Sequence, residues 1–207
     1  PYSTAQYIDL AYARILAVRM SYVGELGWEL YIPSFFTVPV FDAIMAEGKK
    51  YGLKLVGMQA VNSLRLEKGY RHWESDITPD DNPYEAGLGF GVKLGKADFL
   101  GKEALARKKA GKLLRKIVML TLDDSNIMLY GNEPIYRNGE YISTTTSGAY
   151  GFEVGRAVAM GYLKNPKGIT DEWIKEGKYA IMVEGNLVPA TLISGSPYDP
   201  ENLRMKI

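Results

Sequence analysis

The sequence predicts an α+β fold in its first half, followed by a small all-β domain, a barrel or a sandwich, in its second half. Before Gly111, apolar residues recur at both strand-like and helical spacing. After Gly111, short runs rich in β-branched and aromatic residues alternate with Gly and Asn, a pattern typical of β-domains with tight turns. We therefore expect a first domain at 1–111 and a second domain at 112–207.

The first elements should be two strands joined by a tight loop. Residues 13–21 (ARILAVRMS) and 28–32 (WELYI) are rich in apolar and aromatic side chains. Gly24 and Gly27 lie between these two runs and permit a sharp change of direction. This arrangement predicts a hairpin-like unit.

Two amphipathic helices should follow. After Pro33, apolar residues recur at helical spacing as far as Gly48 and Gly52, which mark the end of the helix. The residues that carry this spacing are Val38, Phe41, Ile44 and Met45. A second helix is predicted over residues 58–68, where Gly69 closes it.

The next part of the chain combines a loop with a short helix. Pro79 and Pro83 stand among acidic side chains, so residues 70–84 should form an irregular connection. Asp98 offers an acceptor for the start of a helix, and the cations at 107–109 suit its end, where the helix dipole favours them.

The second domain should contain hairpins. Asn138-Gly139 and Gly185-Asn186 each lie between two β-like runs. Residue pairs of this kind tolerate the positive φ angles that two-residue hairpin turns require. We expect each pair to form such a turn.

The composition excludes several classes of function. The 25 basic and 24 acidic residues nearly cancel, so no net field attracts nucleic acid or an anionic membrane. The absence of cysteine excludes disulfides, a thiol nucleophile and a thiolate metal site. No run of about 18 apolar residues appears. We expect no nucleic-acid or membrane partner, no metal, and a cytoplasmic location, or the mitochondrial matrix in a eukaryotic cell.

Three further features favour ordinary structural roles. His72 is the single histidine, so a catalytic triad or a multi-histidine metal site would depend on one ring. The glycines of residues 87–91 (GLGFG) do not form a dinucleotide-binding fingerprint. The basic cluster at 107–116 lacks interleaved aromatic residues, which favours a solvated surface over an anion site.

The loop of residues 22–29 (YVGELGWE) differs from these features. Two glycines hold Glu25 in a sharp turn, and Tyr22 and Trp28 flank it. Most carboxylates in loops are solvated, and spacing alone favours that interpretation. The alternative is a carboxylate that receives a ligand.

This loop and a second segment resemble the glycine-cleavage T-protein (aminomethyltransferase) family. SYVGELGWELYIP is similar to the family's Y-x-G-E-x-G-x-E stretch, and LRLEKGYRHWESDITPDDNPYEAGLGFGVK is similar to the block that follows it. KGYRHW and the ending SPYDPENLRMK are most similar to the C-terminal folate-binding region of sarcosine dehydrogenase, with dimethylglycine dehydrogenase next. The resemblance implies the C-terminal part of an aminomethyltransferase folate-binding domain at 1–111, followed by a small all-β barrel domain at 112–207.

The resemblance also implies site residues. The glutamate of the family's G-E-x-G loop binds the pterin of tetrahydrofolate, which corresponds to Glu25, with Gly24, Tyr22 and Trp28 beside it. One carboxylate can accept from a pterin ring N–H and from its exocyclic amine. The family's catalytic aspartate lies upstream of this loop, in sequence outside this chain, so no catalytic residue is assigned.

Two departures from the family pattern concern binding residues. An Ala-Arg-Asp triplet of the family corresponds here to Ala60, Val61 and Asn62, and a C-terminal tyrosine of the family corresponds to Leu203. These changes favour the dehydrogenase-fused branch of the family over a true glycine-cleavage enzyme.

The resemblance implies a tetrahydrofolate-dependent one-carbon transferase that produces 5,10-methylenetetrahydrofolate. The expected cofactor is tetrahydrofolate, the expected donor is a small N-methyl amine, and a flavin dehydrogenase domain is an expected partner. The alternative is a non-catalytic folate-binding or docking scaffold. The sequence determines neither the donor nor the oligomeric state.

Overall fold

The computed structural model describes residues 1–207 and begins with a three-stranded antiparallel sheet. Its strands are β1 (Ala5–Leu10), β2 (Ala13–Val18) and β3 (Glu29–Tyr31), in that order. Strand β2 alternates between buried and less buried positions, as a strand with one covered face does. The predicted pairing of the runs at 13–21 and 28–32 is confirmed, and β1 adds a strand that we did not expect.

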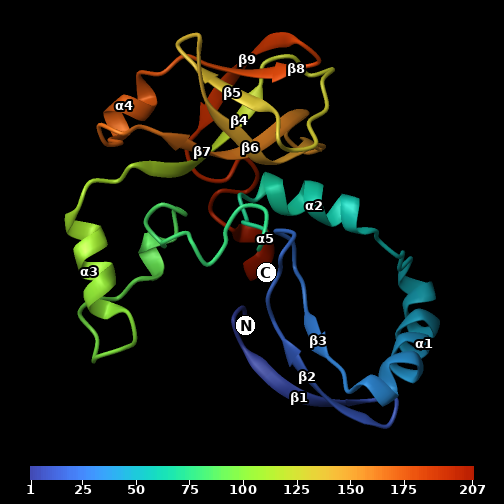
Figure 1. Ribbon diagram of the computed structural model, residues 1–207. Coiled ribbons are helices and arrows are strands. Elements are labelled where there is room, and N and C mark those ends of the chain that lie inside the picture. The colour runs from blue at the N-terminus through green and yellow to red at the C-terminus, as the bar shows by residue number, and fades with distance from the viewer.

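The two predicted helices are present. A short 3₁₀ turn, η1 (Ser34–Phe36), leads into α1 (Thr37–Gly48), and a second one, η2 (Lys49–Tyr51), ends at Gly52 with φ 72°. The α2 helix (Met58–Glu67) follows, and Gly69 has φ 69°. In Figure 1, α1 lies beside the open sheet, while α2 runs beneath the second half of the chain.

An irregular stretch separates α2 from the barrel, as predicted. It contains the 3₁₀ turn η3 (Gly89–Gly91) and the helix α3 (Lys102–Ala110), whose last turn carries three cations. The N-cap of α3 is Gly101, at φ 86°, so Asp98 does not cap this helix as we expected. The reason is that the chain turns once more between Asp98 and the first helical residue.

The second half is a closed barrel of six antiparallel strands, which confirms the barrel over the sandwich. The strands are joined in the order β4-β7-β6-β5-β8-β9. Their bounds are β4 (Arg115–Leu122), β5 (Pro134–Arg137), β6 (Glu140–Gly151), β7 (Arg156–Lys164), β8 (Tyr179–Val183) and β9 (Asn186–Ile193). A core cluster of 13 buried apolar residues fills it, and α4 (Asp171–Lys175) covers part of its outside.

One hairpin turn is as predicted and the other is shifted by one residue. Asn138 and Gly139 have φ 54° and 85° and join β5 to β6. Between β8 and β9, the residues with positive φ are Glu184 (48°) and Gly185 (83°). Asn186 is the first residue of β9, where it pairs with Val183, so the predicted turn at Gly185-Asn186 is wrong. The pairing register places the turn one residue earlier.

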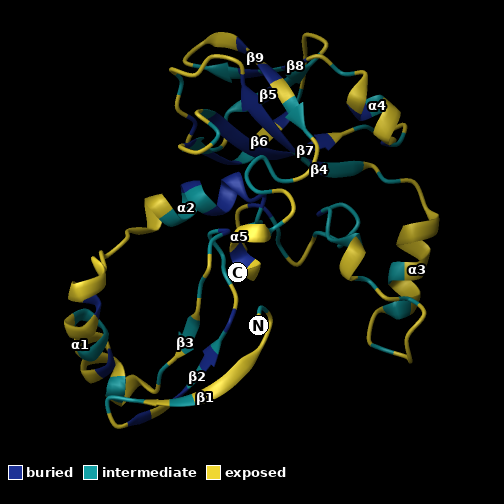
Figure 2. Cartoon of the chain, turned by 180° about the vertical axis from the view of Figure 1, so that it is seen from behind, coloured by how far each residue is buried: buried dark blue, intermediate teal, exposed yellow.

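The last residues return from the barrel to the sheet and end in α5 (Leu203–Lys206). Arg19, 4% exposed, donates to the backbone carbonyls of Met205 (2.9 Å) and Ile207 (3.0 Å). The backbone carbonyl of Arg19 accepts from the amide of Ser3 at 2.8 Å. Figure 2 shows the dark, buried residues concentrated in the barrel and in the adjacent end of α2, while β1 and much of α1 are exposed. None of the helices has the length and apolar character needed to span a bilayer.

Candidate functional site

A cavity of about 620 Å³ lies between α2, the segment that follows it and strand β6 of the barrel. Apolar and aromatic side chains form most of its wall, and the polar ones include Asn62, His72 and Ser147. Helix α2 is held against the barrel by Ser63, whose Oγ donates to the carbonyl oxygen of Tyr150 at 2.5 Å. The cavity is therefore walled by elements from both halves of the chain.

Arg65 forms the base of this cavity and is 2% exposed. Its Nε and Nη2 donate to Asn62 Oδ1 at 2.9 Å and 2.6 Å, and Nη2 also donates to Ser147 Oγ at 2.6 Å. Its Nη1 donates to the carbonyl of Tyr70 (2.9 Å) and to Asp76 Oδ2 (2.5 Å). A guanidinium has about five N–H donors, and all of them are used here. Arg65 can offer no further hydrogen bond to a ligand.

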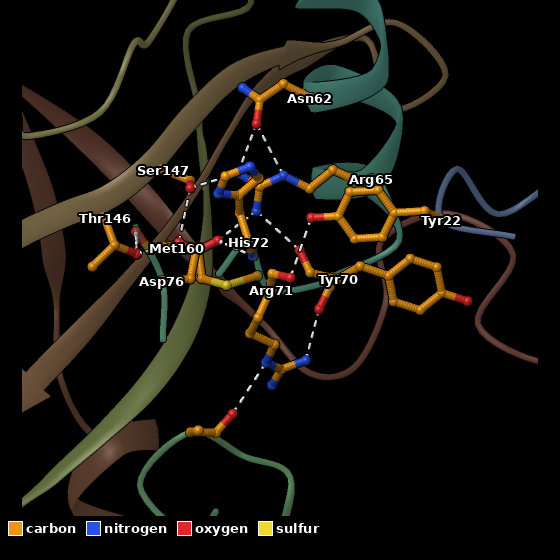
Figure 3. Close-up of polar contacts among 12 residues, drawn as sticks. Tyr22, Asn62, Arg65, Tyr70, Arg71, His72, Asp76, Thr146, Ser147 and Met160 are labelled. Atoms are coloured by element: carbon orange, nitrogen blue, oxygen red, sulfur yellow. Dashed lines mark hydrogen bonds and ion pairs between the residues drawn. The ribbon is translucent and has the colours of Figure 1, made fainter. Parts of the chain in front are cut away.

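Asp76, 1% exposed, is the partner of Arg65 and joins three segments (Figure 3). Its Oδ2 also accepts from the backbone amide of His72 at 2.8 Å. Its Oδ1 accepts from the hydroxyls of Thr146 (2.5 Å) and Ser147 (2.8 Å) on β6. The ion pair therefore positions the loop against both α2 and the barrel, and it explains how a charged pair can be buried.

Tyr22 is the predicted site residue that reaches the cavity wall. Its hydroxyl donates to the carbonyl of Arg71 at 3.2 Å, and its ring stacks on Tyr70, with centroids 6.1 Å apart and planes at 11°. Burial raises the pKa of the Tyr22 hydroxyl, so this group is a neutral donor at physiological pH.

Glu25 lies outside the wall of this cavity. Its Oε1 accepts from the hydroxyl of Tyr198 at 2.5 Å, and its Oε2 lies 3.9 Å from Arg204 Nε. The hydrogen bond to Glu25 raises the pKa of Tyr198. The Glu25 carboxylate is 43% exposed, so it keeps an accessible acceptor oxygen.

Gly24 and Trp28 also lie outside the cavity wall. Gly24 has φ 81°, and a Cβ at this position would lie 2.1 Å from Cγ of the buried Lys68, so close packing alone requires glycine here. Trp28 is 48% exposed, and the Arg19 guanidinium lies 5.7 Å from its ring centroid. Of the four predicted residues, the structure thus brings only Tyr22 to the cavity.

Sequence reasoning missed the Arg65–Asp76 pair, because charged residues in a helix and in a loop ordinarily contact solvent. His72, which we had interpreted as a structural residue, lines the cavity through an exposed side chain. Val61 and Asn62, two of the departures from the family pattern, also line it.

A larger hollow of about 1050 Å³ extends along β4 and β9. Two of its charged side chains already have partners, since Lys116 binds Asp171 at 2.8 Å and Lys68 Nζ donates to the carbonyl of Asp199 at 2.6 Å. Side chains able to hold a metal ion do not cluster anywhere in the chain. The cavity beside Tyr22 is therefore the stronger candidate site.

Comparison with known families identifies the class of protein to which this architecture belongs. Residues 1–96 match the GCVT N-terminal domain, and residues 115–199 match the glycine cleavage T-protein C-terminal barrel domain. The chain belongs to the glycine cleavage T-protein family, which confirms the resemblance seen in the sequence.

Similar proteins include dehydrogenases. Mitochondrial sarcosine dehydrogenase of Mus musculus is 41% identical over 100% of this chain and 23% of its own length. Mitochondrial dimethylglycine dehydrogenase of Homo sapiens is 45% identical over 72% of this chain and 17% of its own length. The mitochondrial pyruvate dehydrogenase phosphatase regulatory subunit of Mus musculus is 35% identical over 86% of this chain and 22% of its own length. The chain thus spans about a quarter or less of these relatives.

The fold has a counterpart among solved structures. The aminomethyltransferase T of the glycine cleavage system of Bartonella henselae matches with a TM-score of 0.77 and 25% sequence identity. The match covers 90% of this chain and 50% of that one.

Proposed function

We propose that this chain is a tetrahydrofolate-dependent, aminomethyltransferase-like module for one-carbon transfer that yields 5,10-methylenetetrahydrofolate. The observation that carries the proposal is the cavity of about 620 Å³, which Tyr22 of the glycine-bounded loop and α2 wall together. Membership of the glycine cleavage T-protein family supports it.

The residues of the cavity fit a folate ring. Small-molecule sites commonly enclose about 300–1,000 Å³ and combine an apolar wall with a few polar groups. The wall contains four aromatic side chains, which suit the faces of a flat heterocycle. These are Tyr22, Tyr130, Tyr150 and Phe152.

Each predicted site residue would contribute differently. Tyr22 would pack against the pterin in the cavity. Glu25 lies outside the cavity wall, so its loop must turn the exposed carboxylate toward the ring before Glu25 accepts hydrogen bonds from the ring N–H and the exocyclic amine. Gly24 keeps the backbone of this loop in a conformation with positive φ. Trp28 is an exposed aromatic wall beside the loop.

Tetrahydrofolate, when bound, supplies the nitrogen atoms that accept the one-carbon unit. The chain would hold the ring and exclude water, so that proximity provides much of the rate. We propose a small N-methyl amine as the source of the carbon and a flavin dehydrogenase domain as the partner. The dehydrogenase relatives, which are named as mitochondrial, support this partner and a location in the mitochondrial matrix in a eukaryotic cell, with the cytoplasm as the proposed location otherwise.

The alternative function is a non-catalytic folate-binding or docking scaffold. One relative is named as a regulatory subunit, which supports this alternative. The Tyr198 hydroxyl that occupies Glu25 Oε1 supports it too, because the carboxylate already has a partner within the chain.

Calorimetric titration with tetrahydrofolate tests the proposal. We expect the wild type to bind and Glu25→Gln to bind at least about tenfold more weakly, because the substitution removes a charged acceptor. Glu29→Gln is the matched control, since Glu29 lies on strand β3 and accepts only from the exposed Tyr31. Equal binding by wild type and Glu25→Gln would remove Glu25 from the site. No binding by a folded chain would refute the folate proposal.

A further inference from the structure

One polar group in the cavity wall has a fixed orientation and unused hydrogen-bonding capacity. Asn62 Oδ1 accepts two hydrogen bonds from Arg65, at 2.9 Å and 2.6 Å (Figure 3). A guanidinium can only donate, so the amide oxygen must face it, and the Nδ2 group must face the other way. No group in the protein accepts a hydrogen bond from Nδ2, and Asn62 lines the cavity.

The wall around Asn62 offers little charge to a ligand. The N–H donors of Arg65 all bind groups within the protein, and Asp76 neutralises its charge, with Nη1 of Arg65 2.5 Å from Oδ2 of Asp76. Among the other lining residues, His72 is the only one with a basic side chain, and none is acidic. An ionised ligand group would lose its hydration here without a matching charge, so the wall favours a neutral acceptor oxygen over a carboxylate.

The shape of the wall favours a flat ligand. Tyr150 and Phe152 contact each other edge to face, with centroids 5.2 Å apart, on the barrel side of the cavity. Tyr22 lies in the same wall and comes from the sheet side of the chain. Aromatic faces on several sides suit a planar heterocycle whose edge can reach an amide donor.

We propose that Asn62 Nδ2 donates a hydrogen bond to the ring carbonyl of a neutral heteroaromatic ligand in this cavity. Asn62 thereby selects a ring with a carbonyl over a ring with an amino group at the same position. The inference rests on the proposed function, in which the ligand is a pterin, and it adds the residue that recognises the carbonyl edge. A ligand with an amino group at that position would place its N–H donor against the Nδ2 donor of Asn62, so neither group would have a hydrogen-bond acceptor.

The test compares folic acid with aminopterin, in which an amino group replaces the ring carbonyl and the neighbouring ring nitrogen loses its hydrogen. Calorimetry on the full chain should show folic acid binding at least about tenfold more tightly than aminopterin to the wild type. In Asn62→Asp, one carboxylate oxygen still accepts from Arg65, while the other faces the cavity as an acceptor. We expect this variant to lose or reverse the preference.

Gln59→Glu is the matched control. It makes the same amide-to-carboxylate change in the same wall, but no hydrogen bond within the protein fixes the Gln59 side chain. The preference for folic acid should survive in this control. Thermal unfolding of the three proteins should show that Asn62→Asp keeps the wild-type fold.

The outcomes separate this inference from the proposed function. If the wild type binds tetrahydrofolate and the folic acid to aminopterin ratio is the same in Asn62→Asp, the inference is wrong and the proposed function stands. If the ratio switches in Asn62→Asp but no one-carbon transfer occurs, the inference stands and the transferase activity is refuted. If a folded wild type binds none of tetrahydrofolate, folic acid and aminopterin, both the inference and the proposed function are wrong.

Discussion

The buried pair between Arg65 and Asp76 provides the sharpest test of how the two halves of the chain are held together. In Asp76→Asn, the volume is preserved, so the substitution leaves no cavity behind. It removes the negative charge that offsets Arg65, whose side chain is 2% exposed against 0% for Asp76. It also places an amide donor where four hydrogen bonds now converge on two carboxylate oxygens.

The expected loss is large. Removing one partner of a buried ion pair destabilises a protein by about 3–5 kcal/mol, because the remaining charge is buried without compensation. At roughly 2–4 °C per kcal/mol for a chain of this size, the melting temperature should fall by about 6–20 °C. Both the free energy of unfolding from urea titration and the melting temperature from circular dichroism measure this effect.

A surface pair serves as the control. Lys50 and Glu47 form an ion pair whose side chains are 58% and 66% exposed. Glu47→Gln should change the free energy of unfolding by less than about 1 kcal/mol. If Asp76→Asn also lost less than about 1 kcal/mol, the Arg65–Asp76 pair would not hold the loop against α2 and β6.

Two further predictions concern residues next to the site. Gly24→Ala should destabilise the chain by about 2–4 kcal/mol in urea titrations, because the positive φ and the contact with the Lys68 stem act together. Gly52→Ala, with φ 72° and open space around the added Cβ, is the control and should lose only about 1–2 kcal/mol. Equal losses in the two variants would contradict the packing argument. Burial raises the pKa of Glu67 above 4.5, so its contribution to stability is fully present below that pH and is lost as pH rises through the folded-state pKa. Glu67→Gln should flatten this decline in urea titrations between pH 4.5 and neutrality, and an unchanged slope would show that Glu67 ionises without penalty.

The sequence predicted the features that depend on local periodicity. The helices α1 and α2 and the pairing of β2 with β3 follow from apolar spacing and from glycines, which act within a few residues. Strand β1 was missed because it is an edge strand with no fully buried position, so it lacks the alternation that identifies strands.

The base of the cavity could not be predicted because its contacts are distant in sequence. Arg65 and Ser147 are 82 residues apart, and Glu25 and Tyr198 are 173 residues apart. No local pattern distinguishes Asp76, which is buried and fully hydrogen-bonded, from the exposed Asp80 in the same loop. The position of Tyr22 could be predicted because it depends on the local geometry of its loop. The surroundings of Glu25 could not be predicted, because they depend on the distant C-terminal segment.

Arg19 connects segments that are far apart in the sequence. Its backbone carbonyl accepts from Ser3, and its guanidinium donates to the carbonyls of Met205 and Ile207. One buried residue just after β2 therefore links the strand β1 side of the sheet to the segment that returns from the barrel. A movement of the C-terminal segment would be transmitted to the sheet through this side chain, although its two partners in that segment are 186 and 188 residues away in the sequence.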